Sequence, residues 1–145
     1  MVDGELPAGE SGAAERRFLS AVGGFGLLAG LVLAGRPALI AASALRGATP
    51  LALLATRELG LALAAVGALA LSVGRSGPRL LRIRAIAIFG VLAAALGVNH
   101  LVRVSTEAEP LFAPAHSYGE AAALIVLAAT AFAIAARGRR DLNAS

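Results

Sequence analysis

Four long apolar runs account for most of this chain, and each is close to the length that crosses a lipid bilayer. They cover about residues 18–35, 51–73, 85–103 and 116–136. A helix needs about 20 residues to cross a hydrocarbon core of about 30 Å. Helices are expected because a helix satisfies its own backbone hydrogen bonds in lipid, and the alternation of a membrane β-strand is missing. The sequence therefore predicts an all-α polytopic membrane protein, a bundle of four transmembrane helices.

The composition agrees with this fold class. The chain has 145 residues, is 58% hydrophobic and has a mean hydropathy of +0.79, whereas soluble domains are roughly 45–50% apolar. Cysteine is absent, which excludes disulfides, thiolate metal sites and cysteine nucleophiles. The 13 basic residues are all arginine and flank the apolar runs, so we expect a lipid bilayer and no nucleic acid as partner. Arginine without lysine in an alanine- and glycine-rich chain indicates high-GC bacterial coding.

The arginines also predict the orientation. Nine of them precede the first run, join the second to the third or follow the fourth, and four lie at the other ends: Arg36, Arg46, Arg57 and Arg103. The positive-inside rule then places both termini in the cytoplasm, with the helices in the bacterial inner membrane. We expect residues 1–17 to be a flexible tail, 18–137 a single transmembrane domain and 138–145 a second tail.

Two further patterns concern packing. Pro37, Gly47 and Pro50 bound a segment that we predict to be a short interfacial helix, the alternative being a kinked continuation of the first helix. Small residues repeat at four-residue spacing in the first two helices and favour close helix contacts; these are Gly26 and Gly30, and Gly60, Ala64 and Ala68.

Three of the apolar runs are too short to cross the membrane without polar residues. The strictly apolar parts of the second, third and fourth helices span about 21–24 Å at about 1.5 Å per residue. Glu58, His100 and Glu120 are the next ionisable groups, each 16 or 17 residues from the cytoplasmic arginine of its own helix. All three are therefore expected at one depth, roughly 24–26 Å above the inner surface.

This layer is the candidate site. A charge costs about 2.5–3.5 kcal/mol or more at the centre of a membrane helix, so such residues usually face partners or a wet cavity. We predict an outward-facing pocket with Glu58, His100 and Glu120 as catalytic residues. Neighbouring polar residues are the candidate substrate-binding set: Arg57, Asn99, Arg103, His116 and Tyr118. The alternative is that these side chains snorkel to water or pair only to orient the helices.

Histidine beside carboxylates suits general acid–base chemistry. The predicted function is an isomerase, cyclase or epoxide-opening enzyme for a lipid-like or apolar small molecule, with no cofactor. A zinc site built from His100, His116, Glu58 and Glu120 is the weaker version, because no HExxH pair occurs and two arginines are close. The alternatives are a non-catalytic small subunit of a larger membrane complex, and a small-molecule transporter, although the first helix carries no charge. As partners we expect an apolar small molecule and either further copies in a homo-oligomer or a larger membrane complex.

A family resemblance rests on three short features. These are the Pro37 segment, the Arg57-Glu58-Leu59-Gly60 opening of the second helix and the Asn99-His100 pair. With them, the chain resembles the small DoxX-like four-helix membrane proteins of bacteria over about residues 18–136. The resemblance implies a four-helix bundle, and it implies no particular activity because most members have none assigned.

Overall fold

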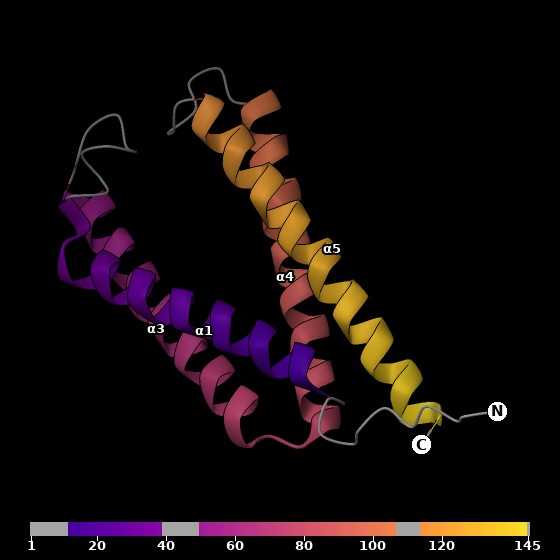
Figure 1. Ribbon diagram of the computed structural model, residues 1–145. Coiled ribbons are helices and arrows are strands. Elements are labelled where there is room, and N and C mark those ends of the chain that lie inside the picture. Colours follow the sequence, from indigo (N-terminus) through magenta and orange to yellow (C-terminus); the bar gives the residue numbers. More distant parts are fainter. Residues whose placement is uncertain (1–11, 39–49, 107–113, 145) are drawn as a thin grey trace.

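The computed structural model describes residues 12–38, 50–106 and 114–144, and within these ranges the chain is helical apart from short turns (Figure 1). The four helices are α1 (Ala13–Gly35), α3 (Pro50–Ser76), α4 (Arg79–Thr106) and α5 (Pro114–Ala144). Each is long and apolar enough to cross a membrane. The described residues contain no strand. The predicted all-α fold with four membrane-spanning helices is confirmed.

The helices extend beyond the predicted apolar spans. α1 begins at Ala13 and α5 continues to Ala144, so part of each predicted tail is helical. A hydropathy limit marks where lipid ends, whereas a helix continues as long as its backbone bonds and end contacts are favourable. Of the predicted interfacial helix, Pro37 and Ala38 have helical conformation and residues 39–49 lie outside the described chain. That element therefore stays a prediction.

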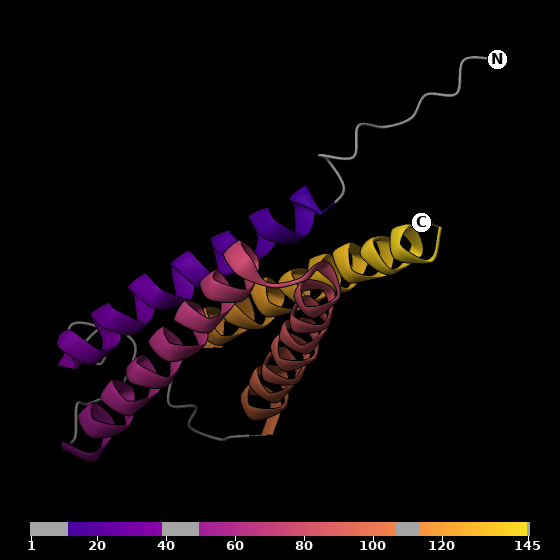
Figure 2. The same ribbon diagram turned by 90° about the horizontal axis from the view of Figure 1, so that it is seen from below.

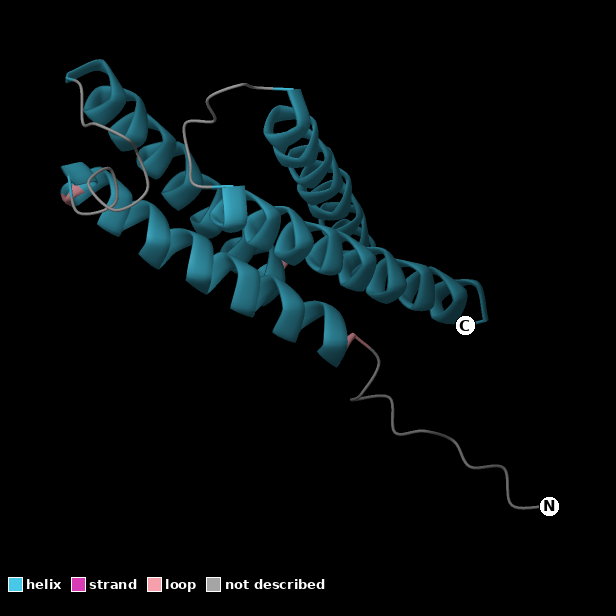
Figure 3. Cartoon of the chain, turned by 90° about the horizontal axis from the view of Figure 1, so that it is seen from above, coloured by secondary structure: helices cyan, strands magenta, loops and turns pink. Residues whose placement is uncertain are grey.

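The helices are paired as two hairpins. α1 packs along α3, and α4 packs along α5, whereas α3 and α5 share no contact within the described residues. Figure 1 shows the hairpins joined where α3 ends and α4 begins and diverging from there, and Figure 2 shows this junction from below. We call this junction the arginine-rich end, and we call the opposite end, with Gly35 and Pro114, the open end. Figure 3 gives the view from above, coloured by secondary structure, in which the described elements are helices.

The first hairpin is closed by glycine. A Cβ atom at Gly23 would lie 2.8 Å from the carbonyl oxygen of Gly67, and one at Gly60 would lie 2.7 Å from that of Gly30. Backbone faces backbone here, so these positions admit no side chain. The predicted small-residue rows take part in this seam except for Ala68, which is exposed. Such close approach gives van der Waals contact along the whole hairpin.

The hydrophobic core that joins the hairpins lies near the arginine-rich end. All four helices contribute to it: Phe18, Leu19, Ala70, Ile83, Ile86, Ala131 and Ala135. Towards the open end each hairpin keeps its own seam, but the two hairpins separate. The fold is therefore two closely packed pairs of helices with one shared base.

Candidate functional site

Two of the three predicted catalytic residues meet in the structure. The Nδ1 atom of His100 lies 3.6 Å from Oε2 of Glu120, and both side chains are partly buried. The pair links α4 to α5 near the open end. It is an ion pair when His100 is protonated.

The face of α5 that carries Glu120 points toward the first hairpin. Leu127, Ile134 and Gly138 lie within about 40° of Glu120 around the helix axis. Leu127 and Ile134 pack against the shared core, and a Cβ at Gly138 would lie 2.8 Å from Oε1 of Glu15. Glu120 therefore lies above the contact between α5 and α1.

His100 has the matching position on α4. Ile86 and Phe89 lie within about 40° of it around the helix axis. Ile86 belongs to the shared core and Phe89 packs against that core. Both members of the pair therefore face the space between the hairpins, above the level where the core ends.

On the α1 side of that space, described side chains are exposed. Phe18 and Phe25 lie two turns apart on one face of α1, and their exposed fractions are 9% and 75%. Val32, two turns further along, is also exposed. We call the space between the hairpins above the core the wedge; it is bounded by Phe25 and Val32 on one side and by His100 and Glu120 on the other.

Glu58 is not part of this pair. It is exposed on α3, and its position is about 120° around the helix from Ala70, the α3 residue in the shared core. Glu58 lies on the first hairpin and Glu120 on the second, and α3 shares no contact with α5 in the described chain. The structure thus brings together His100 and Glu120 without the predicted third member.

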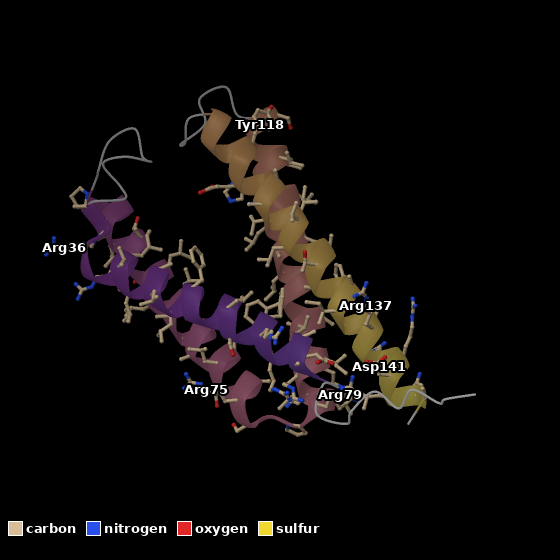
Figure 4. All side chains as sticks on the ribbon, viewed as in Figure 1. Arg36, Arg75, Arg79, Tyr118, Arg137 and Asp141 are labelled. Carbon is tan, nitrogen blue, oxygen red and sulfur yellow. The ribbon has the colours of Figure 1, made fainter. Side chains whose placement is uncertain are left out.

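The predicted substrate-binding residues are spread over the open end. Arg57, Asn99 and Tyr118 are exposed. Tyr118, labelled in Figure 4, precedes Glu120 by two residues and so lies on the opposite side of α5. The side chains of Arg103 and His116 lie outside the described part of the chain.

The described side chains offer few metal ligands. No three His, Asp or Glu side chains converge among them. The zinc alternative would need Glu58 or His116 beside the pair; Glu58 is on the other hairpin, and the side chain of His116 is not described. This part of the structure thus presents two ligands, where a zinc site needs at least three from the protein.

An ionic network at the arginine-rich end was not predicted. Arg79 Nε lies 3.3 Å from Glu15 Oε1, and Arg79 Nη2 lies 2.9 Å from Asp141 Oδ2. Figure 4 shows Arg79 and Asp141 side by side at the base. Glu15 is buried, so the network fixes the start of α1 to α4 and α5. The sequence analysis placed Glu15 in a flexible tail. The one sequence feature that could have indicated this network is that Glu15 directly precedes two arginines.

A second arginine and a small cavity lie beside this network. Arg82 is buried and its Nη1 donates to the carbonyl oxygen of Gly77. The cavity, of about 160 Å³, is lined by Gly12, Ala14, Glu15, Ile134, Arg137, Gly138 and Asp141. Its two carboxylates already bind Arg79. The cavity therefore belongs to the structural base rather than to the candidate site.

Comparisons of the chain with protein-family models, curated proteins and solved structures find no match. The resemblance to DoxX-like proteins therefore stays a prediction.

Proposed function

We propose that the chain binds a lipid-like small molecule in the wedge, with the polar head at His100 and Glu120. The support is the 3.6 Å contact between these two side chains, on helices that are otherwise apolar enough to cross a membrane. Charged groups at membrane depth are costly and mostly serve a ligand, an ion or a proton.

The polarity of the wedge matches an amphiphile. Below the pair, the facing surfaces carry apolar side chains such as Phe25 and Leu127. If the arginine-rich end lies on the cytoplasmic side of a bacterial inner membrane, the wedge opens toward the outer surface of that membrane. A lipid-like molecule in the outer leaflet has its polar and apolar parts in the same order as the wedge, with its head outward and its apolar part toward the membrane centre.

The pair can also perform acid–base chemistry. With Glu120 ionised and His100 protonated, the carboxylate takes a proton from one substrate atom and the imidazolium gives one to another. The proton then passes from Glu120 to His100 across their contact, which restores the starting state. A proton-transfer isomerisation or a cyclisation balances in this way without a cofactor.

A helix of a partner subunit is a second possible occupant. The exposed apolar side chains of the wedge, above all Phe25 at 75% exposure, favour it because a helix would cover them. The chain would then be a non-catalytic subunit, and His100 and Glu120 would be polar contacts to that helix.

Analysis of molecules that co-purify with the chain tests the proposal. The chain is purified from its native membrane in mild detergent, and bound small molecules are identified by mass spectrometry. Ala29→Trp fills the wedge face of α1, while Leu31→Trp adds the same bulk about 160° away around the helix, at an exposed position. We expect a lipid-like molecule with the unsubstituted chain and with Leu31→Trp, and its loss with Ala29→Trp.

Equal retention by both tryptophan variants would contradict a ligand in the wedge. A protein that co-purifies in fixed stoichiometry, is lost with Ala29→Trp and leaves no small molecule bound would instead support the subunit role.

A further inference from the structure

The first helices of the two hairpins correspond at an interval of 64 residues. Phe25-Gly26 in α1 matches Phe89-Gly90 in α4, and Leu28-Ala29 matches Leu92-Ala93. Alanine and leucine matches are common in this composition, but the chain has only five phenylalanines. Gly26 and Gly90 are both buried against the second helix of their own hairpin.

The second helices correspond at the same interval. Pro50 begins α3 and Pro114 begins α5, although the chain holds only six prolines. Near the other end, Gly74-Arg75 of α3 matches Gly138-Arg139 of α5. One interval thus relates the starts of the second helices and a helix–helix contact glycine in both hairpins.

Equivalent residues also make equivalent contacts. A Cβ at Gly74 would lie 3.0 Å from Cβ of Leu19, and a Cβ at Gly138 would lie 2.9 Å from Cδ1 of Ile83. Leu19 and Ile83 are themselves 64 residues apart and are both fully buried. The same glycine in the second helix therefore packs on the same aliphatic residue in the first helix.

Glu15 and Arg79 are also 64 residues apart, and they bind one another. When two copies of a unit are related by a twofold axis, a residue that contacts its own counterpart lies at that axis. Both hairpins start at the arginine-rich end (Figure 1), so the axis runs along the helices from the Glu15–Arg79 pair to the open end. Opposite charges at these positions avoid the repulsion that two identical charges would produce there.

We infer that the chain is a tandem repeat of one two-helix hairpin, and that the hairpins swing as rigid bodies about the Glu15–Arg79 pair to change the width of the wedge. Each hairpin has a close seam, whereas the contacts between the hairpins that the described residues show lie in the core and the ionic network at the base. Membrane proteins built from repeats commonly bind ligands between the repeats and move one repeat against the other. The inference does not depend on what the wedge binds.

Distances between spin labels test the motion on the full chain, which has no cysteine of its own. The double variant Arg36→Cys and Tyr118→Cys measures the distance between the open ends of the two hairpins, and both positions are exposed (Figure 4). Val32→Cys with Leu59→Cys lies within the first hairpin, also at exposed positions. In nanodiscs of phosphatidylethanolamine and phosphatidylglycerol, we expect the distribution between hairpins to be about twice as wide as the distribution within one.

Substitutions of Glu15 and Arg79, which we call the pivot, test whether the twofold axis passes through this pair. Glu15→Gln should widen the distribution between hairpins and leave the one within the hairpin unchanged. In an Asp141→Asn background, Glu15→Arg or Arg79→Glu alone places like charges together and should widen it further. The two reversals combined should restore the width, because a twofold axis makes the two sides of the pair equivalent.

Equally narrow distributions between and within hairpins in the unsubstituted chain would overturn the rigid-body motion, whether or not the pivot variants fold. A combined reversal that is worse than either single reversal would overturn the axis through Glu15 and Arg79.

Discussion

Phe18 and Phe25 lie on one face of α1, two turns apart, but Phe18 is buried in the core and Phe25 is almost fully exposed. The change between them marks the level at which the second hairpin stops covering the first. His100 and Glu120 lie above this level, on the facing surface. A single face of α1 therefore passes from the core to the wedge within two turns.

The acid–base pair is tested by replacing each member with a neutral amide. We expect His100→Gln and Glu120→Gln to lower activity or ligand binding, by about 10²–10⁴-fold for a proton-transfer step. Their effect on stability should be at most about 1 kcal/mol, because the pair is partly exposed. The measurement is turnover, or retention of the co-purified molecule, alongside thermal unfolding in detergent.

Glu58→Gln is the matched control for that experiment. A site confined to the wedge predicts that Glu58→Gln leaves activity and binding unchanged, since Glu58 lies off the wedge face. A loss comparable to that of Glu120→Gln would instead support the three-residue site predicted from the sequence.

Removal of Arg79 should be the most damaging change in the base. Arg79→Gln leaves the buried Glu15 carboxylate without its cation, and breaking a buried pair in this way costs about 3–5 kcal/mol. Asp141→Asn breaks the other contact of Arg79, but Asp141 is 58% exposed, so its cost should be about 0–1 kcal/mol. Thermal unfolding in one detergent compares the two; equal losses would contradict the role of Glu15.

The glycine seam predicts a position-dependent effect of one methyl group. Gly30→Ala places Cβ against the backbone of Ala64 and Gly60, while a Cβ at Gly24 meets nothing within 4 Å. Overpacking should lower stability by about 1–3 kcal/mol at Gly30, and Gly24→Ala should change it by no more than about 0.5 kcal/mol. Similar melting temperatures for the two variants would mean that α1 and α3 lie further apart than the structure shows.

The repeat predicts paired effects at Gly74 and Gly138. Alanine at either position presses on Leu19 or Ile83 and should cost about 1–3 kcal/mol. Gly138→Ala should cost more, because its Cβ also meets Glu15. Thermal unfolding of the two variants compares their losses of stability. A larger loss for Gly74→Ala would show that the Glu15 side chain moves aside without a cost in stability.

The sequence by itself determined the number of helices and their membrane-spanning length, whereas the common depth of Glu58, His100 and Glu120 stays a prediction. Hydropathy and the constant rise per residue fix the number and the length of the helices. The small-residue rows of α1 and α3 also indicated a close seam, since glycine admits a backbone that other residues exclude.

The tertiary structure decided which helices are neighbours and which way each polar residue points. These helices are apolar on nearly every side, and in lipid no hydrophobic penalty favours one face over another. Rotation about the axis is therefore set by packing, which turned Glu120 and His100 toward the wedge and left Glu58 about 120° away from the shared core. The same packing buried Glu15 beside Arg79, because that contact depends on where α1, α4 and α5 meet rather than on any local pattern.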